Sequence, residues 1–477
     1  MANKGWSRRQ ILQGALGVGA AAVAVGAGTS EAVSAETRPP LSSILHLPPR
    51  FKLRRPGSLP DPSLPEGTDT LPEIDHIVVV MQENHSFDNY LGLLGRGDGF
   101  TLDPRGRPTN TNPDPSGGYV RAFHETDTSQ AGHVTQSWNA SHLQYANGKN
   151  NGFIGPESSN EWSMAYYTGE EIPFYYSLAR TFPLCDRYFC SVLAQTYPNR
   201  RFLLAGTAFG LIATDISSVT GIPPNGTIFD RLDAHGISWA SYATNVSTLF
   251  VIEDVVQKNP TRIKTIDQFH ADAKAGSLPA VSYVDPNILT GTEENPQDLA
   301  LGEYFVSTVV GSLVNSPAWR RTLLVWTYDE HGGYYDHVPP PRAIPPDDIP
   351  PNISATDQPG GYDRYGFRVP TVVVSPYSKR DFVSHTVYDH TSVLKTIERK
   401  WNLPAMTYRD ANANDLLDCL DLRRPAFADP PTLAAPGNPT GISTAVPPPA
   451  GEEPPFAAFV KRPGPTNRDA IHARGNQ

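Results

Sequence analysis

Cysteine is scarce in this chain. Cys185, Cys190 and Cys419 are the only three among 477 residues. They form no Cys-x-x-Cys pair, which argues against a zinc site built on cysteine. Cys185 and Cys190 lie close in sequence, but their spacing does not assign a disulfide bond, and any single bond would leave one cysteine unpaired.

The chain also lacks an excess of positive charge. It has 39 Lys and Arg against 49 Asp and Glu, which gives a formal net charge of −10. A nucleic-acid backbone requires a basic protein face, so the composition argues against a nucleic acid as partner. Beyond the N-terminal segment there is no run of about 18 apolar residues, so the mature chain is expected to be soluble.

The N-terminus has the pattern of a twin-arginine (Tat) export signal. Arg8 and Arg9 precede a weakly apolar run rich in Ala, Gly and Val that extends to Gly28. The sequence at 33–35 is Val-Ser-Ala, a suitable cleavage site, so residues 1–35 are predicted to be removed. We therefore expect export by the Tat machinery to the periplasm, the cell wall or the exterior. The alternative is a chance Arg-Arg pair before a membrane anchor.

Proline-rich segments flank the predicted catalytic core. The chain has 47 prolines and 39 glycines, and prolines are dense over residues 36–72 and again after 425. The first segment is predicted to be an extended lead-in, and residues 426–477 a surface or disordered tail. The remaining residues 73–425 are expected to form the folded domain, with residues 96–120 as a long loop over the site.

Apolar, β-branched runs alternate with helical patterns over this core. Leu301, Phe305, Val309 and Leu313 recur at the spacing of one helix face, as do apolar residues over 394–401. The alternation predicts an α/β fold with a mostly parallel central sheet flanked by helices. The predicted strands are 77–80, 237–242, 280–284, 322–328 and 371–375.

Two acidic doublets follow two of these strands. Glu83-Asn84 comes after the strand at 77–80, and Asp329-Glu330 comes after the strand at 322–328. Ligands of open α/β sheets bind outside the carboxyl ends of the strands. Two oxygen-rich clusters there are suited to one hard metal ion or a phosphate-bearing substrate. Alternatively, the doublets are ordinary turn residues.

Thr196 is the candidate nucleophile. Pro198 is typical of a first helical turn, so Thr196 is expected at or near a helix N-cap, where amide donors and the helix dipole favour an anion. A hydroxyl there can ligate a metal ion, lose its proton and attack phosphorus. Asn199 and Arg200 are expected to hold the phosphate oxygens. The alternative is that Thr196 only caps a helix.

At these residues the chain resembles the bacterial phosphoesterase family of phospholipases C and acid phosphatases, within the alkaline phosphatase-like superfamily. The matching motifs span about residues 74–420 in the order of the family, and their combination is specific. They are Glu83-Asn84-His85-Ser86-Phe87-Asp88, Thr196-Tyr197-Pro198-Asn199-Arg200, residues 328–340 (Tyr-Asp-Glu-His-Gly-Gly-Tyr-Tyr-Asp-His-Val-Pro-Pro) and Asp389-His390-Thr391-Ser392.

The resemblance implies a fold, a metal and a mechanism. The fold is an alkaline phosphatase-like core, and the cofactor is a divalent metal ion whose identity stays open. Thr196 would form a covalent phosphothreonine that water hydrolyses, and His133 matches a general acid or phosphate-holding position. His331 would contact phosphate or support the metal, whereas His337 and Asp389 are expected to be structural. The implied metal ligands are Glu83, Asn84, Thr196, Asp329 and Glu330.

Two positions depart from the pattern of the family. Asn295 stands where many members have histidine, and Asn151 where they have aspartate. Both changes remove a titratable group and leave the leaving-group acid and the substrate open. A secreted phospholipase C is the expected function, and an acid phosphatase is the alternative. The competing hypothesis from another functional class is a non-catalytic binding protein on the same fold. Aromatic residues over 166–176 would line a lipid-accepting mouth or belong to the core.

Overall fold

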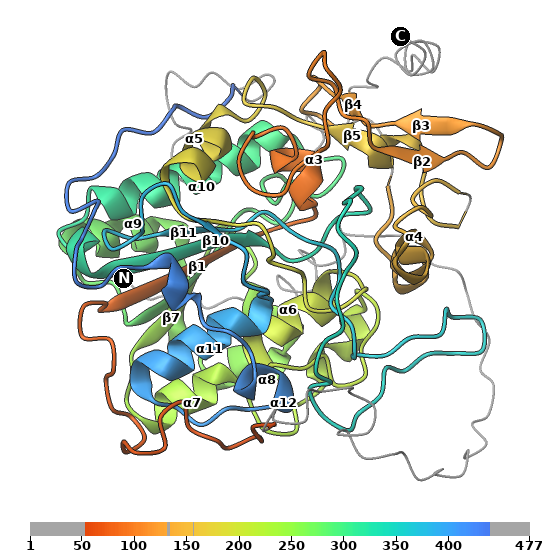
Figure 1. The fold of residues 1–477 in the computed structure, drawn as a ribbon. Coiled ribbons are helices and arrows are strands. Elements are labelled where there is room, and N and C mark those ends of the chain that lie inside the picture. Colours follow the sequence, from red (N-terminus) through yellow and green to blue (C-terminus); the bar gives the residue numbers. More distant parts are fainter. Residues whose placement is uncertain (1–52, 131–133, 156, 439–477) are drawn as a thin grey trace.

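The structure is a computed structural model that describes residues 53–130, 134–155 and 157–438. One eight-stranded sheet runs through this part of the chain (Figure 1). β11 is antiparallel to β10 and β6, and every other neighbouring pair is parallel. From edge to edge the strands are β12 (Val383–Ser384), β6 (Leu184–Cys185), β11 (Val372–Val374), β10 (Thr322–Tyr328), β1 (His76–Gln82), β9 (Val281–Asp285), β7 (Trp239–Ala243) and β8 (Ile263–Thr265).

Helices cover both faces of this sheet. In Figure 1, α5, α9 and α10 lie above it, and α6, α7 and α11 lie below it. The predicted α/β fold with a mostly parallel sheet is therefore confirmed. The helices are α3 (Phe87–Leu91), α4 (Trp138–Tyr145), α5 (Pro173–Thr181), α6 (Thr196–Ala205), α7 (Ile228–Ala234), α8 (Glu253–Lys258), α9 (Ile266–Ala275), α10 (Leu299–Val314), α11 (His390–Trp401) and α12 (Tyr408–Ala411).

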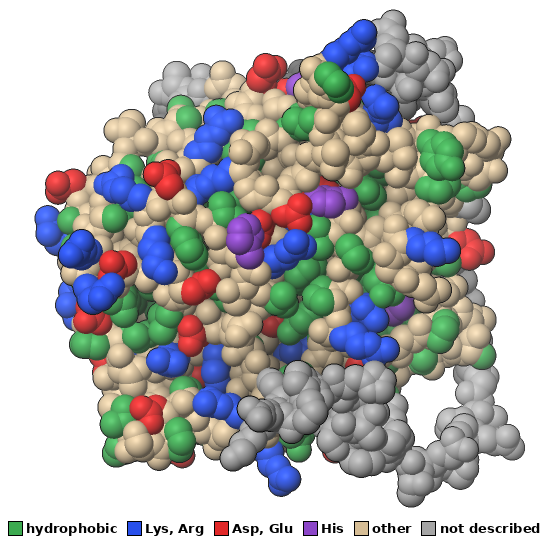
Figure 2. All heavy atoms as spheres, in the orientation of Figure 1, with side chains coloured by type: hydrophobic (Ala, Val, Ile, Leu, Met, Phe, Trp, Pro, Cys, Tyr) green, Lys and Arg blue, Asp and Glu red, His purple; other side chains and the backbone are tan. Residues whose placement is uncertain are grey.

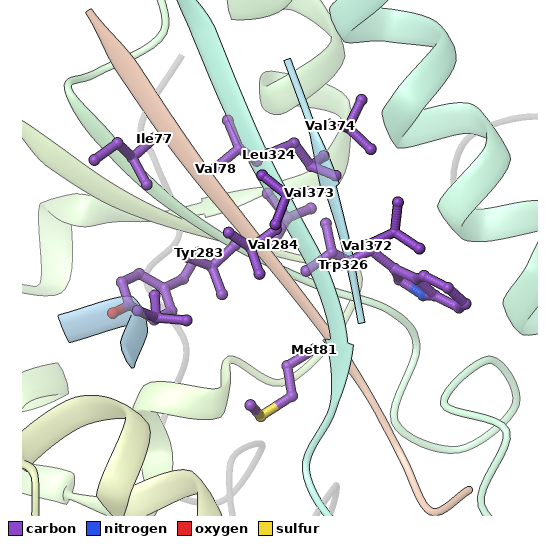
Figure 3. Close-up of a cluster of buried hydrophobic side chains, with 14 of the residues drawn as sticks. Ile77, Val78, Met81, Tyr283, Val284, Leu324, Trp326, Val372, Val373 and Val374 are labelled. Atoms are coloured by element: carbon purple, nitrogen blue, oxygen red, sulfur yellow. The ribbon is translucent and has the colours of Figure 1, made fainter. Parts of the chain in front are cut away.

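The central strands are apolar along their whole length because both faces are covered. Val78 on β1, Leu324 and Trp326 on β10, and Val373 on β11 are all fully buried. Figure 3 shows side chains of these strands packed with Tyr283 and Val284 of β9. All five predicted strands occur, with ends shifted by no more than two residues, and both predicted helices are present as α10 and α11.

The segment predicted as a long loop, residues 96–120, contains a hairpin. β2 (Thr111–Pro113) pairs with β3 (Tyr119–Arg121), and Gly117 and Gly118 make the turn with positive φ. A second small pair joins β4 (Phe123–His124) to β5 (Ala165–Tyr166). Glycine and proline marked the turns in the sequence, but alternating polarity was too weak to reveal such short strands.

The termini are only partly described. Residues 53–72 contain neither helix nor strand and pack along α11, where the amide of Thr70 donates to the carbonyl of Lys400 (2.7 Å). The predicted export signal at 1–35 and residues 439–477 of the predicted tail lie outside the described residues. Within the described ranges no helix combines the length and the apolar character needed to cross a bilayer. Acidic and basic side chains are interspersed on the face in Figure 2.

A buried arginine joins α3 to the segment that follows β10. Arg368 Nη2 lies 3.1 Å from Asp88 Oδ1, and its Nε lies 3.0 Å from Asp336 Oδ1. His337 Nδ1 contacts the other oxygen of Asp88 at 2.7 Å. The two carboxylates and this histidine have the spacing of a metal site. Two positive groups already face the acids, because the contact with Asp88 raises the pKa of His337 to about 9 against the effect of burial. The structural role expected for His337 fits this ion cluster.

Arg368→Met is expected to destabilise the fold strongly. Removing the guanidinium leaves the buried Asp336 without its ion-pair partner and Asp88 with His337 alone, and breaking a buried ion pair typically costs about 3–5 kcal/mol. The matched control is Arg342→Met, whose ion pair with Asp363 is largely exposed and is expected to contribute less than about 1 kcal/mol. Urea unfolding of both variants checks this. Equal losses in the two variants would contradict the cluster's structural role.

Candidate functional site

The pairing of β1 with β10 brings the two acidic doublets together. The strands are parallel and in register, with Gln82 opposite Tyr328, so the residues that follow them emerge at the same edge of the sheet. The amide of Asp329 donates to the carbonyl of Gln82 (3.1 Å), and the amide of Glu83 donates to Thr292 (2.8 Å). All four side chains of the doublets are buried.

The side chain of Asn84 touches both acids of the second doublet. One atom of its amide lies 3.0 Å from Asp329 Oδ1 and 2.8 Å from Glu330 Oε1. As nitrogen, this atom donates to both carboxylates, and the amide oxygen then accepts from Gln136 (3.1 Å). With the amide turned over, three oxygens face one another, and a cation or a proton on one carboxyl group would hold them together.

The donor set fits a hard divalent metal ion. Carboxylate and amide oxygens are its preferred ligands. Glu83 Oε2 is buried without a hydrogen-bond partner among the described residues, so its lone pairs are available. Burial and the neighbouring acids raise the pKa of Glu330, and burial raises that of Asp329. A bound cation would relieve this accumulated negative charge.

Glycine lets the second doublet approach the first. Gly332 has a φ of 68°, and a Cβ there would lie 2.0 Å from the carbonyl oxygen of Asn84. The amide of Gly332 also donates to Glu330 Oε2 (2.7 Å). A side chain at this position would push the doublets apart, so the glycine is required by the close approach.

Arg200 is the cation present in the acidic cluster. Its guanidinium lies 3.0 Å from Asp329 Oδ2, 3.2 Å from Glu83 Oε1 and 3.8 Å from Asp285 Oδ1. The three carboxylates raise the pKa of Arg200 despite its burial. Arg200 was predicted to hold phosphate oxygens. The structure places it beside the doublets, shared among acids.

Thr196 lies at the first position of α6, directly after the N-cap residue Gln195. It is buried, and it lines a small cavity of about 30 Å³ together with Glu83, Arg200 and Asp285. Its hydroxyl makes no hydrogen bond to any residue in the described ranges. The structure therefore brings the predicted nucleophile at the N-terminus of α6 and Glu83 of the first doublet to the same cavity, whose lining does not include Asn84, Asp329 or Glu330.

Asn199 does not face this cavity. Its Oδ1 accepts from the amides of Ser191 (2.8 Å) and Val192 (3.1 Å), and its Nδ2 donates to the carbonyl of Ala194 (2.8 Å). The prediction of Asn199 as a phosphate ligand is thus contradicted, because its amide is used to brace the loop before Thr196. The spacing of the motif could not show whether the Asn199 side chain faces the cavity or the loop before Thr196.

The predicted histidines differ in placement. His331 is buried behind Glu330, and its Nε2 donates to Gln144 Oε1 (2.7 Å), away from the lining of the cavity. Its placement argues against direct contact with phosphate. Burial lowers the pKa of His331 to about 3, so the ring is neutral. His133 lies outside the described residues.

His390 supports Asp329 from below. Its Nε2 donates to the carbonyl oxygen of Asp329 at 2.7 Å, and Tyr188 contacts its Nδ1 at 3.3 Å. Asp389 forms a capping box with Ser392 at the start of α11. The structural role expected for Asp389 agrees with this cap, and His390 fixes the backbone that carries a candidate ligand.

Two acids of the site were missed from the sequence. Asp285 ends β9, beside β1, and its Oδ2 accepts from the amide of Thr248 (2.9 Å). Burial raises the pKa of Asp285 to about 6, opposed by Arg200. Glu294 interacts electrostatically with Glu83 and Asp329, and burial raises its pKa. The doublets were recognised as acids that directly follow a predicted strand. The same rule would have identified Asp285, which follows the predicted strand 280–284.

A buried polar cluster holds the loop that carries Glu294. Glu293 accepts hydrogen bonds from Tyr90 (2.6 Å), Tyr328 (2.5 Å) and Tyr175, and burial raises its pKa to about 7. Its carbonyl oxygen accepts from His85 (3.0 Å). This carboxyl group therefore fixes the backbone next to Glu294 against three tyrosines of the core.

Asn295 and Asn151, the two positions that depart from the pattern of the family, differ in how deeply they are buried. Asn295 is half-buried, and its Nδ2 donates to the carbonyl of Gln130 (3.2 Å) and to Tyr334 (3.4 Å). Asn151 is exposed. The aromatic residues considered for a lipid-accepting mouth are buried and belong to the core; they are Tyr166, Tyr167, Phe174, Tyr175 and Tyr176.

Comparison with known proteins supports the motif assignment. A profile of the Phosphoesterase family matches residues 74–404. Phospholipase C A of Mycobacterium tuberculosis is 32% identical over 422 residues, which cover 77% of this chain and 81% of that protein. Non-specific phospholipase C1 of Arabidopsis thaliana is 34% identical over 381 residues, covering 71% and 69%. Hemolytic phospholipase C of Pseudomonas aeruginosa is 29% identical, covering 75% and 57%.

Among solved structures, a protein of the alkaline phosphatase superfamily from Vibrio parahaemolyticus aligns with a TM-score of 0.35 and 12% identity. The alignment covers 69% of this chain and 78% of that one.

Asp329→Asn is expected to abolish stabilisation by a divalent metal ion. In the wild type, an ion at 100 times its Kd adds about 2.7 kcal/mol of stability, which is read as a rise in Tm with Mn²⁺, Zn²⁺, Mg²⁺ or Ca²⁺. Without metal, the variant should be at least as stable as the wild type, because the substitution removes one of the buried carboxylate charges of the site. Asp348→Asn, at an exposed position, is the control and should retain the rise. A metal-dependent Tm shift in Asp329→Asn equal to that of the wild type would refute the ligand assignment.

Proposed function

Because the chain belongs to the Phosphoesterase family, we propose that it is a metal-dependent phosphoesterase of the phospholipase C type, acting through a phosphothreonine intermediate. The observation that supports this most directly is one cavity at the carboxyl edge of the sheet. Thr196, at a helix N-terminus, shares it with Glu83 and Arg200. A nucleophile, an anion-binding helix end and oxygen ligands are the groups that phosphoryl transfer needs.

Thr196 is the proposed nucleophile. Its Oγ attacks phosphorus, the bond to the ester oxygen of the leaving group breaks, and a phosphothreonine forms. Water then hydrolyses that ester and restores the hydroxyl. A divalent ion held by Glu83, Asn84, Asp329, Glu330 and Thr196 would lower the pKa of the hydroxyl and neutralise phosphate charge.

Arg200 and the N-terminus of α6 are proposed to hold the phosphate. The guanidinium already lines the cavity, and the first amides of a helix favour an anion. A metal ion held by the acids that share Arg200 would neutralise part of their charge. The donors of the guanidinium would then be available to the oxygens of the phosphate.

The leaving alkoxide needs a proton. His133 stays our candidate for the general acid; the described residues on either side of it, Gln130 and Gln136, contact the loop at 293–297 and Asn84. Asn295 has no titratable group, so it is not a proton donor for this step.

The substrate is proposed to be a phospholipid, as in the phospholipases C that the chain resembles. The alternative is a phosphomonoesterase. The substitutions at Asn151 and Asn295 remove titratable groups and leave the substrate class open between the two. Turnover of p-nitrophenyl phosphate and p-nitrophenylphosphorylcholine separates the two, and no turnover of either would favour a binding protein. Export through the Tat machinery is proposed from Arg8 and Arg9.

Thr196→Ala is expected to lower kcat by about 10³-fold or more, since losing a nucleophile costs several orders of magnitude. Its Tm should change little, because Gln195 and not Thr196 is the N-cap. The matched control is Thr227→Ala, which removes a threonine that caps α7. It should lose about 1 kcal/mol of stability and keep its activity. Near-normal turnover by Thr196→Ala would show that this hydroxyl is structural.

Substrates with good leaving groups are expected to be cleaved much faster than alkyl phosphodiesters. General acid assistance contributes about 10²–10⁴-fold and matters most for poor leaving groups. Asn295→His should narrow the difference between nitrophenyl and alkyl esters in single-turnover rates. Similar wild-type rates for both ester classes, with chemistry limiting, would mean that another residue already supplies the proton.

A further inference from the structure

Two of the three cysteines face each other inside the protein. Cys185 ends β6, and Cys419 ends the 3-10 helix Leu416–Cys419 near the end of the described chain. Their sulfur atoms lie 3.8 Å apart, and both side chains are fully buried. The two residues are 234 positions apart in the chain, so only the fold brings them together. Both are thiols in this structure.

Cys190 is not part of this pair. Its sulfur contacts the carbonyl oxygen of Val192 at 3.6 Å, and Gly366 packs so closely against it that a Cβ at that glycine would lie 2.2 Å from the sulfur. The sequence left the pairing of the three cysteines open. The structure favours Cys185 with Cys419, because theirs are the two sulfurs in contact.

Backbone hydrogen bonds hold both cysteines in place. The amide of Cys185 donates to the carbonyl of Thr371 (3.0 Å), and the carbonyl of Cys419 accepts from the amide of Lys379 (3.0 Å). Thr371 and Lys379 lie on either side of β11 (Val372–Val374). The two sulfurs are therefore kept in contact by segments that are anchored to the same part of the sheet.

We propose that Cys185 and Cys419 form a disulfide bond under oxidising conditions, with a low-molecular-weight disulfide as the oxidant, and that this bond fastens the C-terminal segment to the sheet. The thiolate of one cysteine attacks the oxidant, which forms a mixed disulfide and releases one thiol. The second cysteine attacks the protein sulfur of that mixed disulfide and releases a second thiol. Two protein thiols thus lose two electrons and two protons, which reduce the oxidant to two thiols.

The bond requires only a local movement. A disulfide has an S–S distance of about 2.0 Å, so the sulfurs have to approach by roughly 1.8 Å from their present separation of 3.8 Å. The two side chains already point toward each other. Rotation of both, with a small shift of the 3-10 helix Leu416–Cys419, brings the sulfurs together.

Burial decides when the bond forms. Contact with Cys185, together with burial, raises the pKa of Cys419, and the attacking species is the thiolate. A small oxidant therefore reacts with molecules in which the C-terminal segment has opened locally or has not yet packed. The export proposed above would bring the pair to a compartment in which disulfides persist.

The place of the bond gives it a structural effect. β6 and β12 have two residues each, so few ladder hydrogen bonds hold this edge of the sheet. The Asp418 carboxylate adds to them by accepting from the hydroxyls of Ser384 (2.6 Å) and Thr386 (3.1 Å). A covalent link between residues so far apart in the chain also lowers the conformational entropy of the unfolded state. The oxidised protein should therefore be the more stable form.

The test counts thiols in the purified protein before and after oxidation. The protein is incubated with oxidised glutathione in urea below its unfolding transition, and it is then denatured, alkylated and digested. The wild type should fall from three alkylated cysteines to Cys190 alone, and the peptides of Cys185 and Cys419 should be linked. Its Tm should rise by about 5 °C, and dithiothreitol should reverse the rise.

Single substitutions provide the controls. Cys190→Ala is the matched control, because it removes a buried cysteine outside the pair. It should lose both remaining thiols on oxidation and show the same rise in Tm. Cys419→Ala should keep both of its thiols and show no rise. If Cys419→Ala fails to fold, as judged by its Tm, Cys185→Ala removes the other partner.

The outcomes decide the pairing directly. Three alkylated cysteines in wild-type protein that has been refolded from urea with oxidised glutathione overturn the proposal. A linked peptide that contains Cys190, or glutathione adducts without a linked peptide, also overturn it. A link between Cys185 and Cys419 that forms only during refolding supports the pair and shows that the segment stays closed in the folded protein. None of these measurements uses turnover, so the proposal does not depend on the proposed function.

Discussion

The parallel pairing of β1 with β10 is the constraint on which the site depends. Because Gln82 lies opposite Tyr328, the two acidic doublets leave the sheet at the same edge and at the same height. The interior of the sheet is apolar on both faces, so a shift of one residue would bury polar groups and expose valines. The packing energy of the core therefore also sets the geometry of the site. Residues that are hundreds of positions apart face one another because the hydrophobic core leaves them no alternative.

The same arrangement concentrates negative charge in a buried place. Glu83, Asp285 and Asp329 lie around a single guanidinium, that of Arg200, and Asn84 joins Asp329 to Glu330. Burying unpaired carboxylates is costly, and proteins accept such a cost mainly where a cation or a substrate compensates for it. The Arg368 cluster provides the contrast, since there one guanidinium lies between two carboxylates. The first cluster has acids in excess and a neighbouring hydroxyl. The second is balanced, because His337 supplies the other positive charge beside Asp88.

Neutral polar groups give the site its rigidity. His390 holds the carbonyl of Asp329, and His331 lies behind Glu330 with its ring fixed by Gln144. Burial lowers the pKa of both rings to about 3, so they position the acids without adding charge. Glu293 fixes the loop before α10 by accepting hydrogen bonds from three tyrosines. Preorganised groups of this kind let a site act without rearranging during the reaction.

The sequence alone determined the α/β class, the central strands and the two doublets, because strand periodicity and strand-end acids are local signals. It also identified the family, and it predicted Thr196 and Arg200 as residues of the site. It could not show that Asn199 turns toward Ser191 and Val192, since one motif allows either direction for its amide. Nor could it reveal that Arg200 is shared among Glu83, Asp285 and Asp329. Only the tertiary structure decided these points, because the direction of a side chain and the partners of an ion pair depend on contacts between segments that are distant in the chain.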